Sequence, residues 1–205
     1  MLFRVIIFLS LLSLIAACKE PNWVTLKDEN AQISEKYKVN DQKQKDGLYQ
    51  RFSDGVLQEK AHYKADVLSG RRTLYFPDGK PEIEEYYEDG LIIGTYKAYY
   101  EDGTTLQEAH YISGMMQGPL KTYYKNGQLK ELVTMVDNEE NGPFKEYHEN
   151  GQLKWEGRFL NGDNEFGLLK HYNDSGELIK KMECDSLGVC ATIWTLEDGD
   201  VKSDK

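Results

Sequence analysis

The chain has 205 residues, of which 40% are hydrophobic and 29% are charged, and its formal net charge is −10. This length suits one ordinary domain or one modest repeat array, and the limited apolar content favours a thin, extended architecture over a large globular core. The acidic balance disfavours nucleic-acid binding, because it repels phosphate backbones.

The N-terminus has the pattern of an export signal. A short basic start, Met1 to Arg4, precedes an apolar run, Val5 to Leu14, which is too short to span a bilayer as a stable helix and fits a secretory signal peptide. The run ends in LIAAC, residues 14–18, which resembles the lipobox of bacterial lipoproteins. The resemblance implies removal of residues 1–17 and acylation of Cys18. The alternative is an ordinary secretory signal in which Cys18 is incidental.

The residue after Cys18 bears on the destination of the protein. Lipoproteins retained in the inner membrane carry Asp at this position, whereas this chain has Lys19. The resemblance therefore implies lipid anchoring in the bacterial cell envelope at the outer membrane, on its periplasmic face or at the cell surface. Residues 18–45 are polar and fit a lipid-anchored tether, although residues 28–40, DENAQISEKYKVN, echo the repeats below and form a possible degenerate first unit.

Regularly spaced glycines mark an internal repeat. Each follows an Asp, Asn or Ser in a turn-forming segment, and the intervals between them are 24, 24, 24, 24 and 25 residues; these turn glycines are Gly55, Gly79, Gly103, Gly127, Gly151 and Gly176. Such dipeptides are typical of hairpin turns, because Asp and Asn hydrogen-bond locally and Gly adopts the left-handed conformation. A period of this length holds two short strands and two turns.

Aromatic residues follow the same period. Tyrosine stands four residues before the turn glycine in five of the units, at Tyr75, Tyr99, Tyr123, Tyr147 and Tyr172. No single hairpin has a core of its own, so stability must come from contacts between neighbouring units. We expect these five tyrosines to stack on one another and to form the core of the array. The alternative is that repeated Tyr, Lys, Glu and Asn side chains form a binding face.

The repeat unit resembles a known family. Segments such as GPFKEYHENGQLKWEGRFLNG, residues 142–162, and YISGMMQG, residues 111–118, resemble the bacterial MORN-repeat variant family. The resemblance implies an all-β, elongated single-sheet array of stacked β-hairpins, with about six units over residues 46–183. It also implies a protein-binding or scaffold role, and some members carry an antitoxin-like label, so an immunity-like role that neutralises a toxic partner stays open.

The C-terminal residues, 184–205, are expected to form a β cap and a frayed tail. CATIWTL, residues 190–196, is β-rich and can cover the edge of the last hairpin. Cys184 and Cys190 flank a short loop with Gly188, and a disulfide between them fits an oxidising compartment. Two free thiols or a metal-binding pair are the alternatives.

No catalytic pattern stands out from the repeat. Four histidines are spread over the chain, at His62, His110, His148 and His171, whereas a metal site needs three or four converging ligands. The glycines keep the repeat period instead of a phosphate-loop spacing, and no serine sits in a nucleophile elbow. We expect a non-enzymatic protein without cofactor or metal, whose partners are the membrane, through Cys18, and an unknown protein or glycan.

Overall fold

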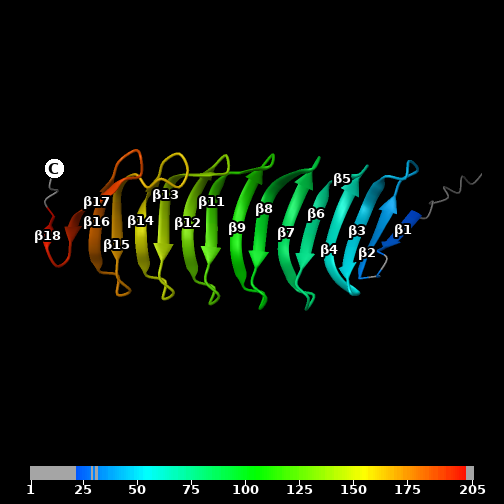
Figure 1. Ribbon diagram of the computed structural model, residues 1–205, viewed down its shortest axis with the longest axis horizontal. Helices are drawn as coiled ribbons and strands as arrows, with labels where there is room; N and C mark the ends of the chain where they lie inside the picture. Colours follow the sequence, from blue (N-terminus) through cyan, green and yellow to red (C-terminus); the bar gives the residue numbers. More distant parts are fainter. Residues whose placement is uncertain (1–21, 29, 31, 202–205) are drawn as a thin grey trace, which may run out of the picture.

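The computed structural model describes residues 22–28, 30 and 32–201. In this part of the chain the only regular structure is one 18-stranded antiparallel sheet. Its strands lie side by side in chain order and make an elongated array, with β1 at one end and β18 at the other (Figure 1). Cys18 lies outside the described residues. No helix in the described part is both long and apolar enough to cross a membrane.

The strands are short, with two to nine residues each. Their bounds are β1 Asn22–Lys27, β2 Ile33–Val39, β3 Lys45–Ser53, β4 Val56–Lys64, β5 Val67–Leu68, β6 Gly70–Tyr75, β7 Pro81–Glu88, β8 Leu91–Tyr99, β9 Thr105–Ile112, β10 Met115–Met116, β11 Gly118–Tyr123, β12 Leu129–Val136, β13 Glu139–Tyr147, β14 Leu153–Phe159, β15 Gly167–Tyr172, β16 Leu178–Cys184, β17 Cys190–Thr195 and β18 Gly199–Asp200. The two-residue strands β5 and β10 extend the hairpins formed by β4 and β9. The predicted all-β array of hairpins in a single sheet is confirmed.

The sheet extends beyond the predicted repeats at both ends. Strands β1 and β2 pair from Asn22 opposite Val39 to Lys27 opposite Ser34, so these two strands form an antiparallel pair inside the segment expected to be a tether with a possible degenerate first unit. At the other end β17 pairs with β16, and the short strand β18 pairs with β17 inside the segment expected to be frayed.

The turn glycines occupy the conformation that their neighbours predict. All six have positive φ, between 79° at Gly55 and 93° at Gly103, a region that side chains with a Cβ seldom adopt. In the third unit the Thr104 amide donates to Asp102 Oδ1 at 2.8 Å, and the Gly103 amide donates to the Tyr100 carbonyl at 2.8 Å. The same pattern of bonds recurs at Gly79, Gly127 and Gly151.

Each unit also contains a β-bulge beside its tyrosine. In the third unit Ala98 pairs with Gln107 but Tyr99 pairs with Thr105, so one residue of β9 is skipped. Equivalent register shifts precede Tyr75, Tyr123, Tyr147 and Tyr172. A regular bulge bends the strand and increases its twist at the same place in every hairpin.

One face of the sheet, which we call the core face, carries the buried side chains. Across the C-terminal half these are apolar: Val133, Met135, Phe144, Leu169 and Cys184, with partly buried Met116, Leu120, Trp155, Phe159, Met182 and Cys190 packed against them. In the N-terminal half the buried set is mixed and comprises Val39, Tyr49, Glu59, Ala61, Thr73, Glu85, Ala98 and Ala109. Among these, only Thr73 faces away, because it pairs with Glu84 on the opposite face.

The expected tyrosine core is wrong in its choice of residues. Tyr75, Tyr99, Tyr123, Tyr147 and Tyr172 are half-buried, and the ring contacts in the described residues involve other aromatics, such as Tyr96 with Tyr111 and Phe144 with Phe159. The physical reason is strand alternation. Tyr99 follows Ala98, which is 7% exposed and lies on the core face, so the tyrosine lies on the opposite face.

Candidate functional site

The face opposite the core carries an uninterrupted row of aligned side chains. Following the pairing partners from β1 to β17 gives one residue from each full-length strand: Thr25, Lys36, Gln50, Lys60, Thr73, Glu84, Lys97, Glu108, Lys121, Leu132, Lys145, Glu156, Lys170, Lys181 and Trp194. Seven of these are lysines and three are glutamates, in a chain whose net charge is −10. We call this the lysine row and its side of the sheet the lysine face.

Two glutamates in the row are each flanked by two lysines. Lys97 Nζ lies 2.7 Å from Glu108 Oε1, and Lys121 is the register partner of Glu108 on its other side. Hydrogen bonding to Lys97 lowers the pKa of Glu108 and raises the pKa of Lys97. The group Lys97–Glu108–Lys121 therefore keeps one net positive charge.

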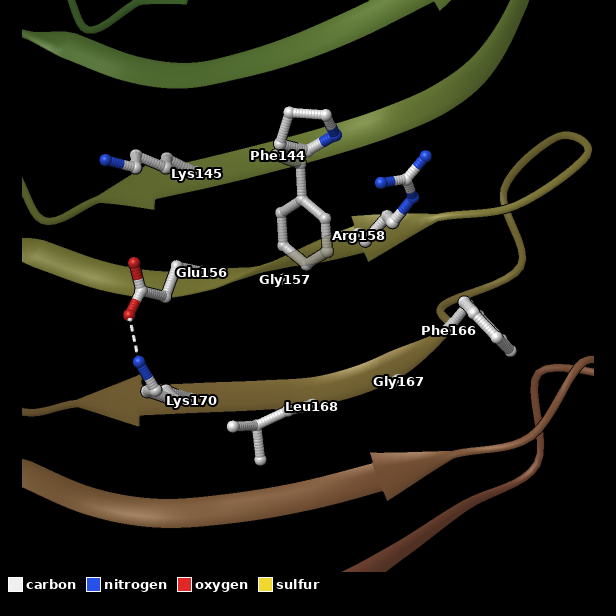
Figure 2. Close-up of a pocket in the computed structure, with 10 residues that line it drawn as sticks. Phe144, Lys145, Glu156, Gly157, Arg158, Phe166, Gly167, Leu168 and Lys170 are labelled. Atoms are coloured by element: carbon white, nitrogen blue, oxygen red, sulfur yellow. Dashed lines mark hydrogen bonds and ion pairs between the residues drawn. The ribbon is translucent and has the colours of Figure 1, made fainter.

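The same arrangement recurs two units later. Lys170 Nζ donates to Glu156 Oε1 at 2.9 Å, and Lys145 is the register partner on the other side. Hydrogen bonds from Lys170 and then from Tyr172 lower the pKa of Glu156. Figure 2 shows Lys145, Glu156 and Lys170 on three neighbouring strands, with the Glu156–Lys170 contact dashed.

The centre of the row has no carboxylate. Leu132 stands between Lys121 and Lys145, and neither lysine has an ion pair within the described ranges. These two ammonium groups, like that of Lys60 between Gln50 and Thr73, are therefore available to an external anion.

A tyrosine accompanies four of the lysines, two residues further along the same strand. The four segments are Lys97–Tyr99, Lys121–Tyr123, Lys145–Tyr147 and Lys170–Tyr172. The hydroxyls of Tyr99, Tyr123 and Tyr172 donate to Glu84, Glu108 and Glu156 at 3.2, 3.2 and 2.8 Å, which places these rings on the lysine face. Leu132 occupies the corresponding position beside Tyr147 and cannot accept such a bond.

Shallow hollows follow the lysine row. From the N-terminal side their volumes are about 320, 150, 260 and 450 Å³, and they contain Lys60, Lys121, Lys145 and Lys170 respectively. The last two share Pro143, Phe144 and Lys145, so they make a continuous depression over β11–β15. The largest hollow is also lined by the exposed guanidinium of Arg158 and by the exposed apolar side chains of Phe166 and Leu168 (Figure 2).

The two turn edges of the sheet are acidic. Exposed acids at the edge of the turn glycines are Asp54, Asp78, Glu101, Asp102, Glu149 and Asp174. At the opposite edge they are Asp66, Glu88, Asp89, Asp137, Glu139 and Asp163. The basic row thus runs along the middle of the face between two negatively charged margins.

Buried charges on the core face are paired with one another. Arg72 donates to Glu59 Oε1 at 2.6 Å and to Glu85 Oε2 at 3.0 Å, and Tyr87 also donates to Glu85 Oε2 at 3.0 Å. Burial lowers the pKa of Arg72, but the two carboxylates outweigh it and the net pKa is raised. Both glutamates are 8% exposed. Their carboxylates are thus already bound, which suits a structural role.

Cys184 and Cys190 are joined by a disulfide between β16 and β17. Glu165 lies beside them, and the three potential metal-ligand atoms are within 4.8 Å of one another. Because the two sulfurs are bonded to each other, they are not available as thiolates, which are the metal-binding form of cysteine.

The comparisons with known proteins support the repeat. The MORN repeat variant family matches four consecutive segments, residues 68–89, 93–113, 116–137 and 140–161. No curated protein matches the chain. The matched segments coincide with the central hairpins of the sheet, which also carry the middle of the lysine row. Residues 68–161 therefore consist of MORN repeat variant repeats.

Proposed function

We propose that this protein is a non-enzymatic binding or scaffold lipoprotein of the bacterial cell envelope, anchored to a membrane through Cys18. The observation that carries the binding role is the lysine face. In the described residues no helix and no second sheet covers it, and its charge is opposite in sign to that of the whole chain. Such a segregated charge pattern steers and orients partners.

Two features support a role without catalysis. Lysine and tyrosine partners lower the pKa of Glu108 and of Glu156 in the lysine row, whereas a general acid needs a raised pKa. Burial raises the pKa of Glu131 and of Glu140, but neither residue lines the hollows described above. The buried glutamates of the core face are bonded to Arg72. An open face with shallow hollows also gives no enclosed space from which water is excluded.

The envelope location rests on the sequence LIAAC and is supported by the disulfide, since such bonds persist in oxidising compartments. Cys18 precedes the first residue of β1 by four positions. Four residues span at most about 14 Å, so an acylated Cys18 would hold the N-terminal end of the array close to the bilayer.

The binding role is tested by crosslinking in envelope fractions. Wild-type protein should recover a specific partner that the double variant Lys121→Glu/Lys145→Glu loses. The matched control Lys43→Glu/Lys125→Glu changes the same charge in exposed turns and should still recover it. Equal recovery by all three proteins would show that the lysine face is not the binding surface. A partner that becomes toxic when this protein is deleted would instead identify the immunity-like role.

The anchor is tested separately with Cys18→Ala. This change should abolish incorporation of labelled fatty acid and release the exported protein from membranes, because a single thiol is the acceptor. Ser13→Ala is the control in the same segment and should leave labelling intact. Unchanged labelling of Cys18→Ala contradicts the proposed anchor.

A further inference from the structure

We propose that the lysine face binds a single chain of a linear anionic polysaccharide, laid along the lysine row and perpendicular to the strands. This names the ligand class for the surface described above, so it rests on the proposed binding role of that surface. It does not depend on the lipid anchor.

The lysine face is periodic along the array. The Lys-x-Tyr segments at 97–99, 121–123, 145–147 and 170–172 repeat the same two groups once per hairpin. Neighbouring strands lie about 4.8 Å apart, so equivalent groups recur about every 10 Å along the array. A surface that repeats one cation and one ring at a fixed interval matches a ligand that also repeats its chemistry at a fixed interval. The surface of a folded protein without internal repeats has no such translational repeat.

The groups that repeat on the lysine face suit an acidic sugar. The lysine ammonium pairs with carboxylate or sulfate. The half-buried tyrosine rings, with the exposed Pro119, Pro143 and Leu168 beside the row, offer flat apolar surface next to each cation. A sugar ring has the complementary form, because its C–H groups cover a flat face while its acidic substituent projects from the rim. An aromatic ring attracts the positive edges of such C–H groups.

The basic part of the lysine face is narrow. The lysine row is flanked at both turn edges by exposed acids, including Asp102 and Glu149 on one side and Asp89 and Asp137 on the other. The strands that carry the row have six to nine residues, which is about 20–30 Å. A nucleic-acid duplex or a flat anionic bilayer would bring its negative charges against both margins, whereas one narrow chain touches only the basic centre.

The length of the array also predicts how the affinity should depend on the length of the oligosaccharide. Four Lys-x-Tyr segments span three intervals, or about 30 Å along the array. Affinity should therefore rise with oligosaccharide length until the ligand reaches all four segments, and then level off, because the added contacts are made by one tethered chain.

The test uses the full-length protein in detergent and calorimetric titration with oligogalacturonates of increasing length. We expect binding that strengthens with length and weakens as salt is added. Neutral dextran should not bind, and polyglutamate and vesicles containing anionic lipid should bind less tightly than oligogalacturonate of equal charge. Tighter binding to polyglutamate or to the vesicles overturns the proposal in favour of an acidic peptide or a membrane surface.

Variants test whether glycan binding depends on the lysine row. Lys121→Gln/Lys145→Gln should weaken the affinity roughly tenfold, whereas the control Lys43→Gln/Lys125→Gln should leave it unchanged. Tyr147→Phe should retain binding and Tyr147→Ala should reduce it, with thermal melts to show that each variant is folded. Equal affinities for the two lysine pairs overturn the proposal. If the wild-type protein does not bind oligogalacturonate, while crosslinking still recovers a protein partner that depends on Lys121 and Lys145, the glycan proposal is refuted and the proposed function stands.

Discussion

At Gly157, on the core face, the packing leaves no room for a side chain. A Cβ at this position would lie 2.8 Å from Phe144 Cε1 and 2.9 Å from Leu169 Cγ. Both neighbours are buried, at 4% and 1% exposure, so neither can move into solvent without loss of packing. The Phe144 ring covers this point of β14, as the view in Figure 2 shows.

We therefore predict that Gly157→Ala destabilises the protein by about 1–3 kcal/mol through overpacking. The measurement is the urea midpoint of unfolding. Lys125→Ala, an exposed change in a turn, serves as the control and should shift the free energy of unfolding by less than about 0.5 kcal/mol. Equal midpoints for the two variants would mean that Phe144 and Leu169 relax freely around the added methyl group.

Glu156 allows a pH test at a single residue. Its pKa lies below the ordinary value of 4.5, because Lys170 and Tyr172 hydrogen-bond to the ionised form. A carboxyl whose pKa is lower in the folded state stabilises above the unfolded pKa and loses this contribution as pH falls through the folded pKa. Glu156→Gln should thus cost less than about 1 kcal/mol near neutral pH, with the difference from wild type vanishing below the folded pKa.

Urea melts of both proteins, from neutral pH to well below 4.5, measure this difference. Glu183→Gln, an exposed change on the same face, is the control and should show a smaller difference at every pH. A difference between Glu156→Gln and wild type that persists unchanged into strong acid contradicts the ionic origin of the effect.

At the scale of strands, Arg72 ties β4, β6 and β7 together through Glu59 and Glu85. Breaking a buried ion pair on one side is costly, because the charge that remains is left without a partner. Arg72→Leu should lower the free energy of unfolding by about 3–5 kcal/mol, whereas Arg51→Leu, which removes a half-exposed guanidinium 3.8 Å from Glu59, should cost far less.

The triple variant Arg72→Leu/Glu59→Gln/Glu85→Gln separates charge from packing. Because it removes the uncompensated carboxylates together with the cation, it should recover part of the stability that Arg72→Leu loses. If the triple variant is less stable than the single one in urea melts, packing of the arginine stem and not charge pairing dominates this cluster.

Hairpins are also tied to their neighbours by bonds to backbone carbonyls. The Tyr100 hydroxyl donates to the Tyr123 carbonyl at 2.8 Å and the Tyr124 hydroxyl to the Tyr147 carbonyl at 2.7 Å. His148 Nε2 approaches the Tyr172 carbonyl at 3.0 Å in the next unit. Each bond joins one unit to the next, so the position three residues before the turn glycine acts as a connector along the array.

We predict that Tyr124→Phe, which keeps the ring and removes this bond, costs about 1 kcal/mol. Tyr86→Phe is the matched control, because Tyr86 is 49% exposed and its hydroxyl has access to water. The readout is again the urea midpoint. A Tyr86→Phe effect as large as that of Tyr124→Phe would show that the connector bond adds nothing to stability.

The sequence predicts hairpins better than it predicts the core, for a physical reason. Turns are local, so Asp102 and Gly103 determine their own geometry. Burial depends on which face of the sheet packs its side chains against one another, and both faces carry large residues, as Tyr96 and Tyr99 illustrate. The lysine row cannot be predicted from the sequence, because it depends on the register of every strand, although the repeated Lys-x-Tyr spacing is a local signal of it.

The whole molecule is a chain of similar units with two kinds of core. In the C-terminal half the buried cluster is apolar and includes Val133, Phe144 and Leu169. In the N-terminal half Glu59, Arg72 and Glu85 occupy corresponding central positions on the core face. Apolar burial stabilises in proportion to its area, whereas a buried ion pair gains little net free energy once desolvation is counted. Because units contact mainly their neighbours, the two halves need not share one stability.

Native-state hydrogen exchange with increasing urea should reveal this difference. Amides of β12–β16 should keep their protection to higher urea than those of β4–β7, because opening of an array is local and follows local stability. The variant Phe144→Ala, which should cost about 3–5 kcal/mol in the apolar half, should reverse the order. Uniform protection along the array, falling in a single step, would instead show that the sheet unfolds as one cooperative body and that its two cores are coupled across every hairpin.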